Sequence, residues 1–168
     1  MNFIVMGVTA SGKSTVAKAL ALQLGLEFLE GDDFHSEENV ALMSVGRALT
    51  DKNRLPWLQS LNKQMMIRCD RNQGFVLSCS ALKMAYRKQL AQEVAPLTFV
   101  YLKGSKALIT QRILNREDHF MSATLVESQF CALQEPTTQE QIRVVSISID
   151  TSVPKIIENV IASLKNTL

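Results

Sequence analysis

Nine residues near the start of the chain, GVTASGKST at positions 7–15, have the residue types and the spacing of a phosphate-binding loop. Gly7 is followed by four residues and then by Gly12, Lys13 and Ser14, which is the pattern G-x-x-x-x-G-K-[ST]. Backbone N–H groups of such a loop cradle phosphate oxygens at the start of the following helix. We expect Lys13 to bridge the β- and γ-phosphates of ATP and the Ser14 hydroxyl to bind Mg²⁺. The predicted nucleotide-binding residues of the loop are Gly7, Ala10, Ser11, Gly12, Lys13, Ser14 and Thr15.

The loop does not choose a reaction, because kinases, switches and motor-type ATPases share it. A kinase for a small hydroxyl compound needs a carboxylate near the acceptor hydroxyl and cations that bind an anionic acceptor. In GDDFH, Asp32 has the position for that carboxylate, with Asp33 as the competing choice, and either also suits a loop carboxylate that caps the next helix. His35 in the same turn is a possible donor to a substrate oxygen, although a single loop histidine is more often a surface or packing residue.

Five basic residues are candidates for the cations that bind the acceptor or the phosphates. Arg54 begins a helix, where a basic side chain gains nothing from the helix dipole, and this favours anion binding. Lys83 opens the helix after SCSAL, and Arg87, one turn later, faces the same way. Arg112 and Arg116 lie one turn apart before EDHF, as expected of lid arginines that reach over the phosphates. An ordinary solvated helix face is the alternative for Lys83, Arg87, Arg112 and Arg116.

Composition indicates one domain that acts on small molecules. The chain has 168 residues, 46% of them hydrophobic and 20% charged, with a net charge of +2, which argues against disorder and against a broad nucleic-acid-binding face. Cys69, Cys79 and Cys131 have no metal-ligand spacing, so we expect them to be reduced and mostly buried. The first residues leave no room for a targeting segment and no later apolar run spans a bilayer, so we expect a cytoplasmic protein without a membrane partner.

Short apolar runs alternate with helical patterns along the whole chain. Strands are expected at 3–6, 27–30, 75–80, 96–104 and 143–150. Helices are expected at 16–24, 37–43, 57–69 with Arg54 at the start, 83–94, 106–116, 125–133 and 153–164. This alternation predicts an α/β fold in which a parallel sheet has helices on both faces. Ligands of such sheets gather at the carboxyl ends of the strands, and GVTASGKS, GDDFH and CSALK all follow strands directly.

The motifs, taken in chain order, resemble those of the small P-loop gluconate kinase family. They are GVTASGKST, EGDDFHSEENVALMSVG, LTDKNRLPWLQSLN, SCSALKMAYRKQL, VYLKG, HFM and LVESQFCALQEP. They cover most of the chain, and CSALK…YR and SQF…L.EP are far more specific than the phosphate loop. The resemblance implies a nucleoside-monophosphate-kinase-like fold in a single domain, with a helical lid at about residues 112–130. It also implies a homodimer that phosphorylates D-gluconate at its 6-hydroxyl with MgATP.

The resemblance assigns roles to residues at matching positions. The family's aspartate after the second strand falls on Asp32, and its lid arginine falls on Arg116, followed by the HF pair His119 and Phe120. The implied catalytic set is Lys13, Asp32 and Arg116, with Arg112 and Arg116 also on the nucleotide. The implied acceptor-binding set is Asp32, His35, Arg54, Lys83, Arg87 and His119.

Four departures from the family pattern leave every residue assigned to the chemistry in place. Ala10 stands where the family loop usually has glycine, and alanine is disfavoured there if the backbone needs a positive φ. Ala48 replaces a common proline, and the acidic run before Arg54 is thinned to DKNR. In the lid, REDH replaces a more basic run. Two rival functions remain: a related kinase for idonate or shikimate, and a nucleotide-binding switch, against which the several cationic or histidine side chains of the acceptor site argue.

Overall fold

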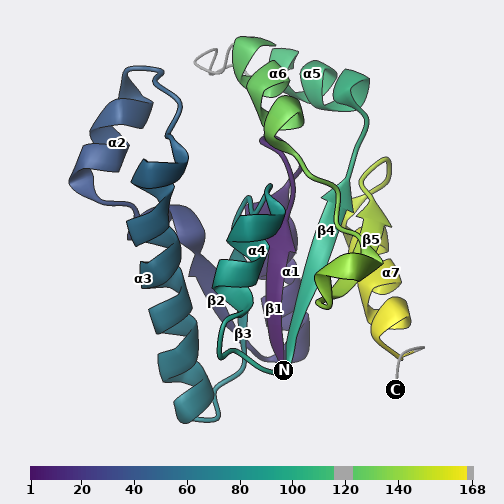
Figure 1. Cartoon of the computed structure of the whole chain (residues 1–168). Coiled ribbons are helices and arrows are strands. Elements are labelled where there is room, and N and C mark those ends of the chain that lie inside the picture. The colour runs from purple at the N-terminus through teal and green to yellow at the C-terminus, as the bar shows by residue number, and fades with distance from the viewer. Residues whose placement is uncertain (116–122, 166–168) are drawn as a thin grey trace.

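Five parallel strands form one sheet in the order β2-β3-β1-β4-β5 in the computed structural model, which describes residues 1–115 and 123–165 (Figure 1). The strands are β1 (Asn2–Met6), β2 (Glu27–Glu30), β3 (Phe75–Ser78), β4 (Leu97–Lys103) and β5 (Arg143–Ser148). The helices are α1 (Lys13–Leu24), α2 (Glu37–Ser44), α3 (Asp51–Asp70), α4 (Met84–Ala91), α5 (Lys106–Leu114), α6 (Ala123–Ala132) and α7 (Val153–Lys165). Two 3₁₀ turns, η1 (Gly31–Phe34) and η2 (Thr138–Glu140), complete the fold. The predicted parallel α/β architecture is confirmed.

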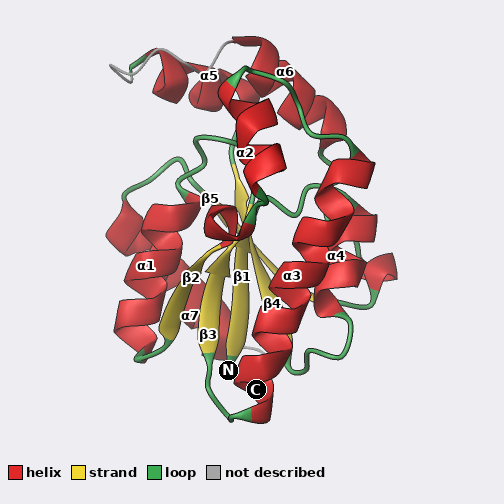
Figure 2. Ribbon diagram, turned by 90° about the vertical axis from the view of Figure 1, so that its left-hand side faces the viewer, coloured by secondary structure: helices red, strands yellow, loops and turns green. Residues whose placement is uncertain are grey.

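The sheet is buried on both faces because successive side chains of a strand point to opposite sides. In β1, Phe3 and Val5 belong to the apolar cluster that includes α1 and α7. Ile4 and Met6 belong to the cluster on the other face, which is covered by α3 and α4. Figure 2 shows α1 on one side of the strands and α3 with α4 on the other. This double burial makes the central strands the rigid base from which the loops at their carboxyl ends extend.

Helix α3 begins at Asp51 rather than at Arg54 because Thr50 and Asn53 form a capping box there. Trp57 is buried as expected for a core residue, and its indole N–H donates to the Gly31 carbonyl oxygen at 2.8 Å. Asn39 of α2 also donates to the Asn53 carbonyl oxygen at 3.0 Å. These bonds join the start of α3 to η1 and to α2, which extends beyond the carboxyl ends of the strands (Figure 1).

The three cysteines are free thiols, but they are not all buried. Cys79 is buried and Cys69 is partly buried, whereas Cys131 is exposed on α6, so the expectation of mostly buried cysteines is wrong for this residue. Helix α6 lies at the end of the sheet rather than over one of its faces, which leaves one side of the helix uncovered (Figure 1). Within residues 1–115 and 123–165, none of the helices has the length and apolar character that crossing a bilayer requires.

Arg87 is fully buried in α4, which corrects the expectation that it faces the acceptor. Its guanidinium donates to both carboxylate oxygens of Glu140, at 2.5 and 2.7 Å, and to the carbonyl oxygens of Ala81 and Leu82, at 2.9 and 3.0 Å. The hydrogen bonds from Arg87 lower the pKa of Glu140 against the opposing effect of burial. Arg87 therefore holds the segment that leads into Lys83, and it is a structural rather than an acceptor-binding residue.

We expect Glu140→Gln to lower the free energy of unfolding by about 3–5 kcal/mol at neutral pH, because it leaves a buried guanidinium without its counter-charge. The lowered pKa of Glu140 means that the pair stabilises the fold fully above the ordinary glutamate pKa and loses this effect as the pH falls through the lowered value. Urea unfolding of both proteins should show the difference narrowing from neutral to acid pH. In the control Glu158→Gln, which removes an exposed ion pair with Lys155, the change should be small. A difference that is equal at every pH would contradict the ionic account.

Candidate functional site

The loop between β1 and α1 needs glycine at two positions for different reasons. Gly7 has φ 149°, and a Cβ there would lie 2.9 Å from Ser11 Oγ and 3.0 Å from the Leu102 carbonyl oxygen. Gly12 has φ 91° and open space around it, so only its backbone conformation requires glycine. It is the N-cap of α1 and no side chain caps the helix there. The N–H groups at the start of α1 are therefore placed to bind an anion such as phosphate.

Ala10 has a positive φ, the backbone conformation in which alanine is disfavoured relative to glycine. Its φ is 57°, in the left-handed region, where a Cβ costs roughly 1–2 kcal/mol. The Ala10 methyl is buried in the apolar cluster on the α1 side of the sheet, and such burial contributes about 0.8 kcal/mol. Packing thus offsets part of the backbone strain, which explains how the loop keeps its shape without a third glycine between residues 7 and 12.

Lys13 and Ser14 lie at the start of α1, beside the end of β3. The Lys13 ammonium donates to the Val8 carbonyl oxygen at 3.0 Å, so it spans the loop. Ser14 Oγ lies 3.4 Å from Ser78 Oγ, the last residue of β3. Two hydroxyl oxygens at a phosphate loop fit Mg²⁺, which prefers oxygen ligands and takes most of its coordination from water and phosphate. Thr15, the remaining predicted loop residue, is exposed in the first turn of α1.

Asp32 lies in η1 and His35 is the residue that ends this turn, but the surroundings of the two side chains differ. The Asp32 side chain is 83% exposed, whereas the His35 side chain is 4% exposed and stacks on Trp57 with 4.2 Å between ring centroids. His35 Nε2 lies 3.9 Å from Asp32 Oδ1, and Nδ1 lies 3.4 Å from Asn39 Nδ2. Burial lowers the pKa of His35, and the Arg54 charge adds to this while Asp32 opposes it, which favours a neutral imidazole at neutral pH. His35 is thus placed behind Asp32 as a neutral packing and hydrogen-bonding group.

Cys79 marks the space between the phosphate loop and η1. Burial, with a contribution from Asp32, raises the pKa of its thiol to about 12, while Lys13 acts in the opposite direction. The charges of Asp32 and Lys13 act on the pKa of this thiol in opposite directions. A thiol with this pKa stays protonated at neutral pH, which excludes Cys79 as a thiolate nucleophile.

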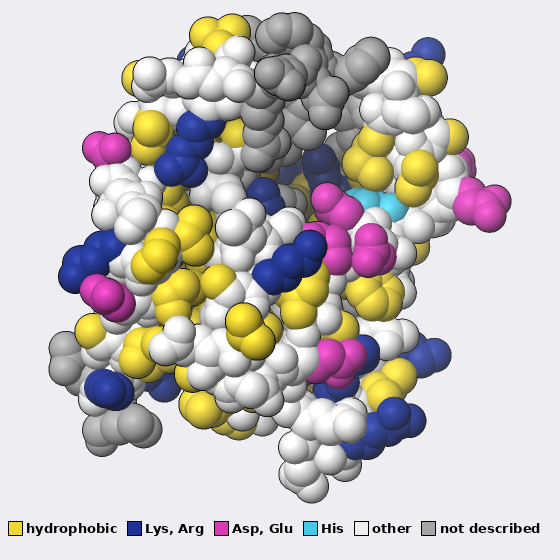
Figure 3. Space-filling view, turned by 180° about the vertical axis from the view of Figure 1, so that it is seen from behind, with side chains coloured by type: hydrophobic (Ala, Val, Ile, Leu, Met, Phe, Trp, Pro, Cys, Tyr) yellow, Lys and Arg dark blue, Asp and Glu magenta, His cyan; other side chains and the backbone are white. Residues whose placement is uncertain are grey.

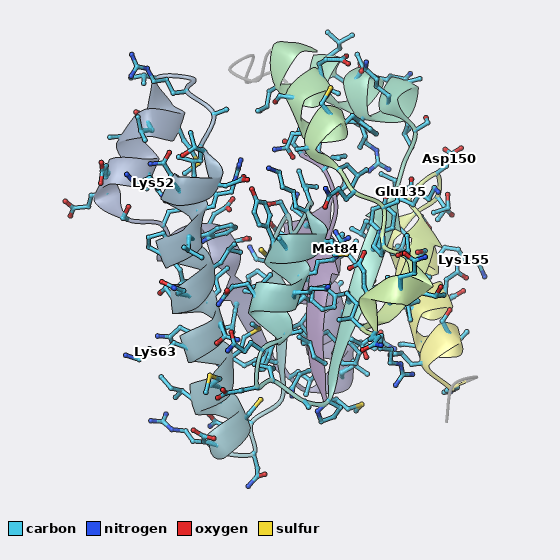
Figure 4. The ribbon with its side chains drawn as sticks, viewed as in Figure 1. Lys52, Lys63, Met84, Glu135, Asp150 and Lys155 are labelled. Atoms are coloured by element: carbon cyan, nitrogen blue, oxygen red, sulfur yellow. The ribbon has the colours of Figure 1, made fainter. Side chains whose placement is uncertain are left out.

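Arg54 and Lys83 meet around the ring of Tyr86. The Arg54 Cζ and the Lys83 Nζ lie 5.9 and 5.6 Å from the centre of that ring. Arg54 also donates to the Leu49 carbonyl oxygen at 2.6 Å, and Lys83 donates to both carboxylate oxygens of Asp51 at 2.8 Å. The structure therefore brings two of the predicted acceptor-binding cations together. Figure 4 shows the ends of α3 and α4 that carry them, marked by Lys52 and Met84.

Sequence reasoning missed Asp51 and Tyr86 in this group, although the Tyr86 hydroxyl donates to the same Asp51 carboxylate. The sequence spacing could have indicated both residues. Asp51 precedes Arg54 by three residues, and Lys83 precedes Tyr86 by three, so each pair lies one helical turn apart. Both pairs lie in motifs that carry the family resemblance, LTDKNR and SALKMAYR.

Helices α5 and α6 contact the phosphate loop through its backbone. Arg112 of α5 donates to the Ile149 carbonyl oxygen at 2.7 Å and lies 3.4 and 3.5 Å from the carbonyl oxygens of Ser11 and Ala10. Gln129 of α6 accepts a hydrogen bond from the Thr9 N–H at 3.1 Å. Gln129 was not predicted as a site residue either, although it lies in the SQF…L.EP motif that carries the family resemblance. The predicted residues Arg116 and His119, with Phe120, lie outside the described residues.

A hollow separates the α2 side of the molecule from the α5 and α6 side. Figure 3 shows Lys and Arg side chains inside this hollow and Asp and Glu side chains on its rim. The described parts of the chain contain no group of three or more His, Cys, Asp or Glu side chains placed to hold a metal ion. The basic side chains inside the hollow suit a phosphorylated ligand.

The Gln129 contact leads to a test of how α6 acts on the loop. Gln129→Leu removes the acceptor of the Thr9 N–H, and we expect a loss of stability of about 1 kcal/mol together with a several-fold weaker affinity for MgATP. Urea unfolding and calorimetric titration with MgATP measure the two effects. Gln134→Leu is the matched control, because the Gln134 Oε1 accepts from the Met84 N–H, away from the loop. Equal nucleotide affinity in both variants would show that the Gln129 contact is structural only.

Comparison with known proteins places the chain among small kinases. The model of an AAA domain family, AAA_33, matches residues 3–138. A probable gluconokinase of Dictyostelium discoideum is 41% identical over 170 residues, covering 96% of this chain and 85% of that protein. A gluconokinase of Gluconobacter oxydans is 42% identical over 139 residues, covering 83% of this chain and 78% of that protein. The crystal structure of a gluconokinase from Sinorhizobium meliloti is 38% identical, with a TM-score of 0.88 over 99% of this chain and 92% of that one.

Proposed function

Because the chain belongs to the gluconokinase family, we propose that it transfers the γ-phosphate of MgATP to the 6-hydroxyl of D-gluconate, giving 6-phospho-D-gluconate. One observation carries this proposal beyond the family: the phosphate loop and the Arg54 and Lys83 cations lie at the same edge of the sheet, and Asp32 lies in the turn that follows β2 at that edge. One edge of the sheet therefore has groups suited to bind a phosphate donor and groups suited to bind an anionic acceptor. A homodimeric, cytoplasmic enzyme that serves gluconate utilisation stays a prediction from the family resemblance.

The donor side of the reaction depends on charge placed around the transferred phosphate. Lys13 has the position to bind the β- and γ-phosphates, and the loop N–H groups and the start of α1 bind the remaining oxygens. Ser14 would hold Mg²⁺, with Ser78 Oγ beside it. The ion supplies positive charge to the phosphate oxygens when it is bound. Arg112 keeps the loop in register with the segment after β5 through Ile149, and Arg116 is proposed to reach the phosphates from the lid.

The acceptor side depends on a carboxylate and on cations at the other end of the substrate. Arg54 and Lys83 would bind the single carboxylate of gluconate, since charge-assisted hydrogen bonds to a carboxylate are strong. Asp32 would orient the 6-hydroxyl and accept its proton, because its carboxylate is exposed in the turn after β2, at the edge of the sheet that carries the phosphate loop. The neutral His35 ring supports the turn behind Asp32. The rate then comes mainly from placement and electrostatics, as in other phosphoryl transfers.

The proposed function is tested by following ADP release from MgATP with gluconate, idonate, shikimate, glucose or no acceptor. We expect turnover with gluconate and little with the others. Lys13→Met should lower this turnover at least about a hundredfold, because it removes a charge that stabilises the transition state. Lys18→Met on the exposed face of α1 is the matched control and should change little. Turnover with idonate or shikimate would assign the chain to a related kinase, and slow hydrolysis unaffected by any acceptor would favour a switch.

A second pair of variants distinguishes the role of Asp32 from that of its neighbour Asp33. Asp32→Asn should reduce kcat by roughly 10²–10⁴-fold while changing KM for gluconate much less, because the carboxylate acts on the proton of the reacting hydroxyl. Asp33→Asn, in the same 3₁₀ turn and also exposed, should leave kcat nearly unchanged. Steady-state kinetics with varied gluconate gives both constants. An effect of Asp32→Asn confined to KM would make Asp32 a binding group, and the reverse pattern in the pair would assign its role to Asp33.

A further inference from the structure

We propose that Asp51 makes the acceptor site selective for a single negative charge, by balancing one of the two cations that face the acceptor. The proposal rests on the proposed function, because it concerns the specificity of that site. Two cations and one carboxylate leave one net positive charge in the group formed by Asp51, Arg54, Lys83 and Tyr86. One positive charge complements a monocarboxylate, whereas a second negative charge on the acceptor finds no second positive charge in this group.

The contacts of Asp51 show that it is held in the group rather than free in solvent. Lys83 Nζ donates to both of its oxygens at 2.8 Å, and the Tyr86 hydroxyl donates to Oδ1. These hydrogen bonds lower the pKa of Asp51, with Lys83 as the largest cause, and the charge of Arg54 adds to the effect. Asp51 therefore stays ionised throughout the neutral range, and its negative charge is a permanent part of the site.

The same contacts leave donors for an acceptor. An ammonium has three N–H donors, of which Asp51 uses two on Lys83, so one remains for a substrate oxygen. Arg54 spends one of its five donors on the Leu49 carbonyl oxygen. The side chains of Lys83 and Asp51 are 31% and 64% exposed, so an acceptor reaches them without rearrangement of the core. Asp51 thus orients Lys83 while reducing the charge that an acceptor encounters.

The local sequence makes Asp51 the acidic residue of this turn. Residues 51–54 read DKNR, in which Lys52 and Asn53 contribute no negative charge. The Asn53 side chain is committed to the capping box with Thr50. Arg87 of α4 forms a buried pair with Glu140 of η2, and this pair adds no net charge. The charge of the group is therefore determined by Asp51, Arg54 and Lys83, and changing Asp51 alone changes it by one.

Binding constants for ligands of different charge test this proposal. The probes are D-glucitol, D-gluconate and D-glucarate, six-carbon polyols with no, one and two carboxylates. In Asp51→Asn we expect no change for glucitol, a gain of a few fold for gluconate and a further gain of a few fold for glucarate, since the electrostatic effect scales with ligand charge. Repulsion between the second carboxylate of glucarate and Asp32 is present in both proteins and cancels in this comparison. Added salt should reduce these gains, because the site is exposed. Calorimetric titration and competitive inhibition measure the constants.

Controls separate charge from structure and from the proposed function. Asp51→Glu keeps the charge and should keep the ratio of glucarate to gluconate affinity, and Asp70→Asn at the other end of α3 should do the same. The ratio is measured within each variant, so partial unfolding does not affect it. Equal changes for all three ligands in Asp51→Asn would overturn the proposal and make Asp51 a structural residue. Wild-type turnover with gluconate reports separately on the proposed function.

Discussion

The parallel pairing of β1 with β3 is the constraint on which the rest of the site depends. Val5 lies opposite Ser78 in this register, and beyond it the Cys79 N–H donates to the Val5 carbonyl oxygen at 3.1 Å and the Gly7 N–H to the Ser80 carbonyl oxygen at 3.3 Å. The phosphate loop and the segment that leads to Lys83 are thereby joined by backbone bonds. On the other side of β3, a Cβ on Gly31 would lie 2.3 Å from the Ser78 carbonyl oxygen, so η1 also lies against the end of this strand.

The charges of the site are sharply divided between groups that are ionised and groups that are kept neutral. Burial keeps the Cys79 thiol protonated and favours the neutral form of His35, and burial together with the bond to Asp51 raises the pKa of Tyr86. Uncharged groups therefore fill the space behind the ionised ones. The electric field that a substrate meets then includes the charges of Lys13, Asp32, Asp51, Arg54 and Lys83. This division explains why one carboxylate such as Asp51 carries weight in specificity.

Local features were predictable from the sequence, and long-range pairings were not. The phosphate loop, the strands and the helices follow from glycine spacing and apolar periodicity, which are properties of short segments. Arg87 was misassigned because its partner Glu140 lies 53 residues away, in a 3₁₀ turn too short to show a periodic pattern. The contact between Gln129 and Thr9 spans 120 residues of sequence and was missed for the same reason. Helical spacing correctly placed Arg87 one turn after Lys83, but spacing alone does not tell which side of α4 is covered by another segment.

The contacts of α5 and α6 with the phosphate loop act on opposite polar groups of its backbone. Arg112 donates to carbonyl oxygens of the loop, whereas Gln129 accepts from a loop N–H, so the two helices hold the loop through complementary bonds. The loop includes Ala10 in a left-handed conformation, a strain that bonds from outside help to balance. We therefore expect nucleotide binding and the position of these helices to be coupled through the loop backbone, because a shift of α5 or α6 would change the bonds that hold the loop.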